Sequence, residues 1–205
     1  MMDNSIQNHW NAVYKTKGPD QVSWTQEVPK TSLDFIHSFS LAKNAKIIDI
    51  GGGDSKLVDY LLKEGYEDIT VLDISEKALE KVKARLGDAA KKVKWIVSDI
   101  VDFVPTESYT LWHDRATFHF LTTSGQIKKY MDTARKAVND YLTIGTFSVN
   151  GPETCSGLAV KQYSETALQE EIRHGFNKIR CINEDHVTPF NTSQSFLFCS
   201  FKKKA

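Results

Sequence analysis

Cysteine is scarce in this 205-residue sequence, and the three that occur, Cys155, Cys181 and Cys199, include no Cys-x-x-Cys pair. An odd number of cysteines without paired spacing indicates neither a disulfide framework nor a zinc site. We therefore expect free thiols, no bound metal and a reducing, cytoplasmic setting.

An excess of charge is also missing, because 26 basic residues balance 26 acidic ones. A nucleic-acid-binding chain normally carries a basic excess or stripe, so no nucleic-acid partner is expected. No apolar run approaches the length that crosses a bilayer, and the first residues lack the pattern of a signal peptide. The sequence predicts a folded domain without a membrane partner, and it carries no signal for an oligomeric state.

From about residue 46 onward, apolar runs of strand length alternate with amphipathic segments of helix length. This alternation predicts βαβ units and a parallel sheet covered on both faces. Ser75 is a good N-cap for the helix that follows the second strand, and Gly87 is expected to end that helix. Five parallel strands are expected, at 46–50, 69–73, 93–97, 109–114 and 141–149.

The pattern changes after the fifth strand. A helix capped by Ser164 precedes two further apolar strands at 176–183 and 195–201. Their link, 184–192, is too short for a crossover helix, so the last two strands should be antiparallel. The predicted fold class is therefore α/β, a three-layer α/β/α sandwich whose mostly parallel seven-stranded sheet ends in a C-terminal antiparallel hairpin.

The sequence predicts two parts of unequal size. Residues 1–44 should form an arm, with one or two helices and an extended segment lying across the site, and residues 45–205 the main domain. The arm carries Trp10, Tyr14 and Trp24.

A glycine-rich turn follows the first strand, in the stretch Asp49-Ile50-Gly51-Gly52-Gly53. Glycines let the backbone approach a ligand closely, and the N–H groups at the start of the next helix favour an anionic group. A plain, tight strand-to-helix connection is the alternative reading of this turn.

Two more acids follow at intervals of one βα unit. Asp73 comes 22 residues after Gly51, where a carboxylate can accept both ribose hydroxyls of a nucleoside. Asp99, preceded by Ser98, ends the third strand, within reach of an adenine amino group. An N-terminal helix charge and a loop turn are the alternative roles. Because parallel strands bind ligands at their carboxyl ends, both acids and Asp49 should lie along one edge.

As a set, these segments resemble the motifs of the class I methyltransferases that use S-adenosylmethionine (SAM). The glycine turn resembles their motif I, Val71–Ser75 their acidic loop and Val97–Ile100 their adenine-binding motif; Trp10–Tyr14 is similar to a W-x-x-x-Y stretch of the arm. The resemblance implies a SAM site made by Trp10, Tyr14, Asp49, Gly51, Gly52, Gly53, Asp73, Ile74, Ser98, Asp99, Ile100 and Asp114.

The end of the fourth strand should border both the cofactor and the acceptor. Asp114 is expected either to hold the amino group of SAM or to contact the acceptor, and Arg115 pairs with a substrate acid or with Asp114. His119 is a candidate general base or a wall residue. Asp114 and His119 are thus the catalytic candidates. The substrate-side candidates are Trp24, Arg115, His119, Cys155, Tyr163 and His186.

The favoured activity is methyl transfer to a small molecule, with a protein side chain as the alternative acceptor. Methylation of nucleobases is disfavoured, because the Asn/Asp-Pro-Pro-Tyr-like motif is missing after the fourth strand. An NAD-dependent oxidoreductase is disfavoured, because Lys56 stands where the dinucleotide fingerprint has its third glycine. A SAM-binding subunit without catalytic activity is a further alternative.

Overall fold

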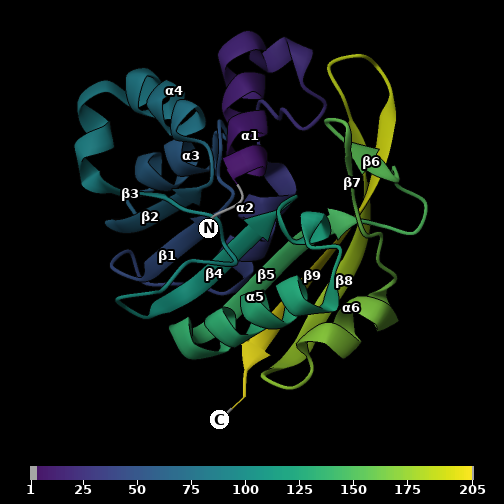
Figure 1. Ribbon diagram of the computed structural model, residues 1–205. Helices are drawn as coiled ribbons and strands as arrows, with labels where there is room; N and C mark the ends of the chain where they lie inside the picture. Colours follow the sequence, from purple (N-terminus) through teal and green to yellow (C-terminus); the bar gives the residue numbers. More distant parts are fainter. Residues whose placement is uncertain (1–3, 205) are drawn as a thin grey trace.

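In the computed structural model, which describes residues 4–204, seven strands form one sheet in the order β3-β2-β1-β4-β5-β9-β8 (Figure 1). The first five strands in chain order are parallel, and the last two join them in antiparallel fashion. The predicted sheet is thereby confirmed. The strands are β1 (Lys46–Ile50), β2 (Asp68–Asp73), β3 (Val93–Val97), β4 (Tyr109–Arg115), β5 (Val138–Phe147), β8 (Phe176–Val187) and β9 (Ser193–Lys203).

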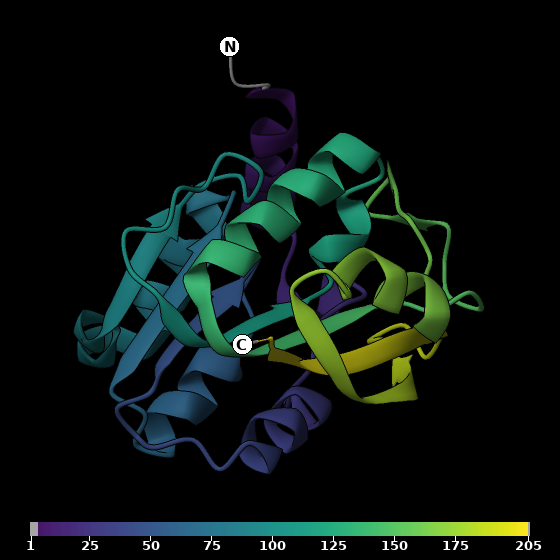
Figure 2. The same ribbon diagram turned by 90° about the horizontal axis from the view of Figure 1, so that it is seen from below.

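Helices cover both faces of the sheet and make the three expected layers (Figure 2). One face carries α2 (Lys30–Ser38), α3 (Leu57–Lys63) and α4 (Glu76–Leu86), and the other carries α5 (Ser124–Ala137) and α6 (Glu165–Ile172). Short 3-10 turns, η1 (Pro19–Gln21), η2 (Gly87–Lys92) and η3 (Phe118–Phe120), lie in the connections. None of the helices within residues 4–204 combines the length and apolar character needed to cross a membrane.

The predicted helix ends are confirmed where the structure shows the capping contacts. The hydroxyl of Ser75 accepts a hydrogen bond from the backbone N–H of Ala78 at 3.2 Å, and α4 ends at Gly87. The hydroxyl of Ser164 accepts from the N–H of Ala167 at 3.1 Å. Each cap satisfies one of the backbone donors that a helix start leaves free.

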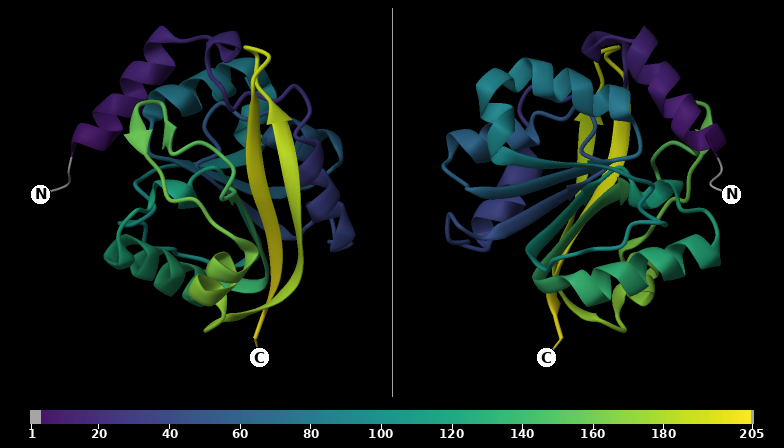
Figure 3. Two further views of the ribbon diagram at one scale, coloured as in Figure 1. Left: turned by 90° about the vertical axis from the view of Figure 1, so that its right-hand side faces the viewer. Right: turned by 60° about the vertical axis from the view of Figure 1, so that its left-hand side comes forward.

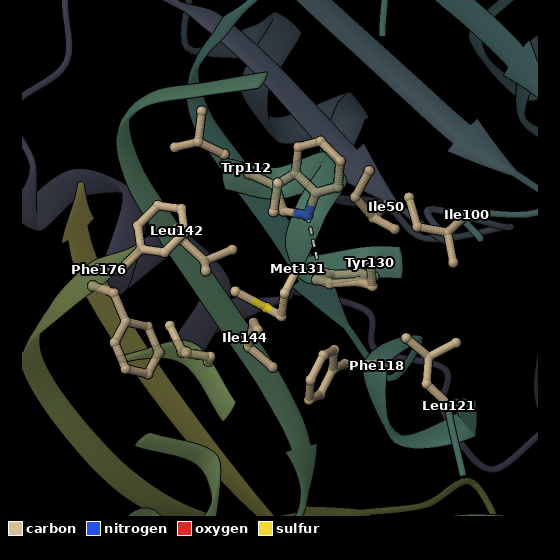
Figure 4. Close-up of a cluster of buried hydrophobic side chains, with 14 of the residues drawn as sticks. Ile50, Ile100, Trp112, Phe118, Leu121, Tyr130, Met131, Leu142, Ile144 and Phe176 are labelled. Carbon is tan, nitrogen blue, oxygen red and sulfur yellow. Dashed lines mark hydrogen bonds between the residues drawn. The ribbon is translucent and has the colours of Figure 1, made fainter. Parts of the chain in front are cut away.

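The buried side chains divide into clusters on the two faces of the sheet. On β1, Ile48 and Ile50 pack toward α5, whereas Ile47 packs toward α2, α3 and α4. Figure 4 shows the α5 side, where the indole Nε1 of Trp112 donates to the hydroxyl of Tyr130 at 2.8 Å. This alternation decides which strand residues can reach a given face.

Several details of the strands differ from the expectation. β5 begins at Val138, directly after α5, and ends at Phe147 rather than residue 149. The β8–β9 ladder continues through most of the predicted link, because Glu184 and His186 still pair with Phe196 and Gln194. A two-stranded hairpin, β6 (Thr154–Cys155) with β7 (Leu158–Ala159), was not predicted at all.

The expectation of free thiols is wrong for two of the cysteines. Cys181 on β8 and Cys199 on β9 form a disulfide, 18 residues apart in the chain. They occupy directly opposite positions of the antiparallel ladder. Sequence spacing could not show this, because the pairing depends on the strand register. Cys155 is free and buried.

The arm contains α1 (Asn4–Thr16), the segment 17–29 and α2. Residues 1–3 of the predicted arm and residue 205 of the predicted main domain lie outside the described residues. The side chain of Asn11 accepts hydrogen bonds from Ser75 and from the N–H of Lys77, so α1 is held against the start of α4. The turn end of the β8–β9 hairpin reaches the segment after α1 (Figure 3). The ring of His186 there lies 2.7 Å from the carbonyl of Ser23.

Candidate functional site

A cavity of about 610 Å³ lies at the carboxyl ends of β1 to β4, beneath the arm. Side chains and turns from opposite ends of the chain meet in its wall, as the alignment of the acids along one edge predicts. The predicted site residues that line it are Trp10, Tyr14, Trp24, Asp49, Gly51, Gly52, Asp73, Ile74, Ser98, Asp99, Ile100, Arg115 and Cys155.

The glycine turn after β1 needs glycine for a steric reason. Gly51 has φ +63°, and a Cβ built there would lie 1.7 Å from the hydroxyl oxygen of Thr117. That hydroxyl donates to the carbonyl of Ile50 at 3.2 Å, so the turn packs tightly against the segment after β4. Such close packing is possible only without a side chain at residue 51.

Asp73 is buried at the end of β2, beside the glycine turn. Its carboxylate accepts a hydrogen bond from the N–H of Ser75 at 2.7 Å. Burial raises the pKa of Asp73 to about 7, although the backbone donors of Ser75 and Gly53 act in the opposite direction. A carboxylate with a raised pKa gains from additional hydrogen-bond donors, and a pair of ribose hydroxyls would supply two.

Asp99, the third acid of the predicted site, lies after β3. Asp99 accepts from the N–H of Val101 at 3.0 Å, and the hydroxyl of Ser98 donates to the carbonyl of Asp99 at 2.9 Å. Ile100 is almost fully buried next to them. The three residues present an apolar surface with acceptor groups, which suits a flat base that carries an amino group.

Aromatic side chains from the arm cover the cavity. The ring of Trp10 on α1 contacts the rings of Trp24 and Phe120, with centroid distances of 5.7 and 5.2 Å, and Tyr14 packs against Trp24 at 6.2 Å. All four rings line the cavity. The cover is therefore attached to both the arm and the segment after β4.

A buried chain of hydrogen bonds that the sequence analysis missed forms part of the wall. Nδ1 of His113 on β4 lies 2.7 Å from Asp49 of β1, and Nε2 lies 2.9 Å from the hydroxyl of Ser32 on α2. Each of the three is at most 4% exposed, and all three line the cavity. The order Ser–His–Asp is that of a hydrolase triad, in which the acid orients the imidazole and the imidazole accepts the proton.

Arg115 lies two residues further along β4, on the same face. Its Nη1 donates to the carbonyl of Trp24 at 3.0 Å, and its guanidinium lies 5.0 Å from the ring of Phe196. Burial lowers the pKa of Arg115 to about 10. Of the two partners considered for Arg115, Asp114 does not pair with it, because adjacent strand residues point to opposite faces of the sheet.

Asp114 faces α5 and lies outside the cavity lining. It is fully buried and accepts from the hydroxyl of Tyr130 at 2.8 Å and from the N–H groups of Thr117 and Phe118. Burial raises the pKa of Asp114 to about 6. These contacts hold the segment after β4 in place.

His119 is also buried away from the cavity. Its ring stacks on Phe147 at 4.4 Å and accepts a hydrogen bond from the N–H of the same residue. Burial, reinforced by the nearby charge of Arg115, lowers the pKa of His119 to about 3. The imidazole is therefore neutral over the physiological range.

Three further predicted residues, Tyr163, His186 and Gly53, are not part of the cavity lining. Tyr163 packs against Phe118, and His186 contacts the carbonyl of Ser23. Gly53 is covered by Tyr14, whose hydroxyl would meet an added Cβ at 2.5 Å. Cys155 does reach the cavity, and burial raises the pKa of its thiol to about 11. Across residues 4–204, no group of three or more His, Cys, Asp or Glu side chains is placed to hold a metal ion.

Residues 47–140 match the family model described as a methyltransferase domain. This stretch contains the glycine turn, the acids Asp49, Asp73 and Asp99, and the end of β4. Its strands belong to a seven-stranded sheet of the class I type. Residues 47–140 are therefore similar to a methyltransferase domain, and the chain has the fold of the class I methyltransferases.

Curated relatives of the chain act on different acceptors. The chain is 23% identical over 172 residues to the eEF1A lysine and N-terminal methyltransferase of Mus musculus. This match covers 82% of the chain but 24% of the relative. It is 38% identical over 82 residues to the malonyl-[acyl-carrier protein] O-methyltransferase of Anoxybacillus flavithermus, covering 39% of the chain and 30% of the relative. The chain thus spans 24% of the length of the first relative, and its match covers 30% of the second.

Solved structures share the fold along almost the whole chain. The N-methyltransferase NodS from Bradyrhizobium japonicum, in complex with S-adenosylhomocysteine (SAH), has a TM-score of 0.73 and 14% identity, covering 96% of this chain and all of that one. The 1,6-didemethyltoxoflavin-N1-methyltransferase from Burkholderia thailandensis, with bound acceptor and SAH, has a TM-score of 0.73 and 15% identity, covering 98% and 88%.

Proposed function

We propose that this protein is a methyltransferase that uses SAM to methylate a small-molecule acceptor. The observation that carries the proposal is the single cavity in which Asp73 and the glycine turn line one part, and Trp24, Ser32 and Arg115 line another. Such a cavity has room for a nucleoside cofactor beside an acceptor. The cavity residues fit the cofactor, because Asp73 suits the ribose, Asp99 and Ile100 the adenine, and Asp49 with the glycine turn the amino-acid end.

The bound cofactor would supply a methyl group that is already activated by its sulfonium. The protein then has to align the acceptor and exclude water. The aromatic cover of Trp10, Tyr14, Trp24 and Phe120 performs the second task, and its ring faces favour a neighbouring cation. In this proposal, residues 1–44 form the arm that closes over residues 45–205, and the protein works in the cytoplasm.

An acceptor that must lose a proton needs a base at the cavity. Ser32 and His113 line it, and the proton can pass from the acceptor to the Ser32 hydroxyl while that hydroxyl gives its own proton to Nε2 of His113. Asp49 stabilises the imidazolium that results. Asp114 and His119, the candidates from the sequence, remain alternatives, but neither lines the cavity in this structure.

A protein side chain is the second candidate acceptor. The eEF1A lysine and N-terminal methyltransferases among the relatives favour it. The small molecule is preferred because the acceptor part of the cavity is lined by buried side chains, Ser32 and His113 among them. An NAD-dependent oxidoreductase and a SAM-binding subunit without activity remain the competing classes.

Calorimetric titration with SAH and with NAD tests the cofactor. We expect SAH to bind and NAD not to bind. Incubation with methyl-tritiated SAM and separated small-molecule and protein fractions of a cell extract then tests the acceptor. Label in the small-molecule fraction supports the proposal, label in the protein fraction favours the second candidate, and SAH binding without labelling favours a subunit without activity.

The base assignment is tested with four variants, Ser32→Ala, His113→Asn, Asp114→Asn and His119→Asn. SAH affinity is measured first, so that loss of cofactor binding is separated from loss of turnover. We expect the first two variants to lower turnover and to change its pH profile, whereas His119→Asn retains the wild-type profile. An unchanged profile in His113→Asn contradicts the proton route.

A further inference from the structure

The guanidinium of Arg115 is hydrogen-bonded through Nη1, whereas its Nε–Nη2 edge has no hydrogen-bond partner among the described residues. Nη1 donates to the carbonyl of Trp24, and both Nε and Nη2 are buried. Nε–H and the adjacent N–H of Nη2 point the same way from the planar group. Together they form the two-pronged edge that binds a carboxylate or phosphate with two parallel hydrogen bonds.

No protein acid occupies this edge. Asp49 and Glu184 are close enough to influence Arg115 electrostatically, but neither forms an ion pair with it in the structure. Asp49 is already bonded to His113. A buried cation without an anionic partner is costly, so an arginine in this state is suited to a ligand that brings the missing charge.

The side chains around Arg115 indicate which chemical character the rest of that ligand should have. The guanidinium lies over the ring of Phe196, and Trp24, Phe120 and Cys155 line the same part of the cavity. These neighbours are apolar, apart from the thiol, which is protonated because burial raises its pKa to about 11. An apolar body with one anionic group matches this compartment.

The other cations of the cavity wall are already paired. Lys56 lies 2.5 Å from Glu27, and Arg85 forms ion pairs with Asp54 and Asp59. Among the cavity-lining residues that the structure describes, Arg115 is therefore the cation left without an acidic partner. Arg115 is also close to His113, because the two residues lie on the same face of β4, about 7 Å apart along the strand.

We propose that the methyl acceptor is a small apolar acid, whose carboxylate or phosphate group binds to the Nε–Nη2 edge of Arg115. The inference rests on the proposed function. Its reactive atom then lies toward Asp49 and His113, at the cofactor end of the cavity. Trp24 belongs to the arm and holds Nη1, so closure of the arm would seal the ion pair from water.

The test uses pairs of probes that differ only in charge. Benzoate, phenylacetate and 3-phenylpropionate are compared with their amides, and phenyl phosphate represents the phosphate class. Each probe is titrated by calorimetry or ligand-observed NMR into the full chain, with and without saturating SAH. The variants are Arg115→Met, Arg115→Lys and, as the matched control, Lys56→Met.

We expect at least one acid to bind the wild type about tenfold more tightly than its amide, as one charge-assisted hydrogen-bond pair should give. Arg115→Met should lose this preference, Arg115→Lys should keep part of it, and Lys56→Met should keep all of it. Stronger binding of phenyl phosphate than of the carboxylates would identify the phosphate class.

Two results overturn the inference. One is a wild-type protein that binds SAH but prefers no acid over its amide. The other is an Arg115→Met variant that binds SAH and keeps the preference. Failure of the proposed function looks different, because SAH itself then does not bind, whatever the acids do. If Arg115→Met does not fold, Arg115→Lys with unchanged acid affinities gives the overturning result.

Discussion

Nδ1 of the His113 imidazole lies 2.7 Å from a carboxylate oxygen of Asp49, and the two residues are direct neighbours across β4 and β1. Both side chains are nearly inaccessible to water. The contact therefore joins the central strands of the sheet at the point where the cavity begins. It also satisfies an acid that would otherwise be buried without a donor at Oδ1.

Replacing His113 with Leu should lower the free energy of unfolding by about 3 kcal/mol, because a buried carboxylate loses its partner. Urea denaturation of the wild type and the variant measures the difference. His174→Asn is the control, since His174 is exposed and the change should stay below about 0.5 kcal/mol. A loss of under about 1 kcal/mol in His113→Leu would show that the contact contributes little.

Asp73 should make the stability of the ligand-free protein fall as pH rises. Its pKa is raised from 3.8 to about 7, so between these values the folded state binds more protons than the unfolded state. Stability is then lost on the way from about pH 4 to about pH 7. Asp73→Asn should be more stable than the wild type by about 2–4 kcal/mol near pH 8, and by little near pH 4.

Denaturant unfolding at both pH values measures this effect. Asp20→Asn is the matched control, because Asp20 is exposed. If Asp73→Asn shows the same difference from the wild type at both pH values, Asp73 does not titrate as described.

Asp73→Asn, which should stabilise the ligand-free protein, should weaken the binding of SAH. Two ribose hydroxyls favour an ionised Asp73, so SAH binding near pH 6 should release protons, and Asp73→Asn should bind SAH about tenfold or more weakly. Calorimetry in two buffers of different ionisation enthalpy detects the proton release. Equal affinities for the wild type and the variant would place the ribose elsewhere.

Gly51→Ala should be strongly destabilising, by about 3 kcal/mol or more, because a Cβ at φ +63° would overlap the hydroxyl of Thr117. Gly125→Ala is the matched control. Gly125 lies within α5 with no heavy atom near its Cβ position, so alanine should stabilise the protein by about 0.5–1 kcal/mol. Thermal unfolding of the two variants compares them directly, and similar midpoints would contradict the steric argument.

The cysteine pairing predicts how many thiols can be labelled. Iodoacetamide added to the unfolded protein without reductant should modify only Cys155, and all three cysteines should react after reduction. Peptide mapping by mass spectrometry identifies the modified residues. Labelling of Cys181 or Cys199 without reductant would mean that the disulfide is not formed in solution.

Much of this protein was determined by its sequence alone, because the signals are local. Apolar runs and helix caps placed β1 to β4 to within a residue, and the glycine turn with Asp73 and Asp99 indicated the edge of the sheet at which the cavity lies. These features depend on side chains near one another in the chain, or on the rule that parallel strands end at one edge.

The tertiary structure decided the rest. Ser32 and His113 are 81 residues apart, and only the packing of α2 on the sheet brings them together. Which of His113 and Asp114 faces the cavity depends on which helices cover each face. The register of β8 against β9 decided the pairing of Cys181 with Cys199. Contacts across a sheet follow from strand order, pleat and register, which no local stretch of residues specifies.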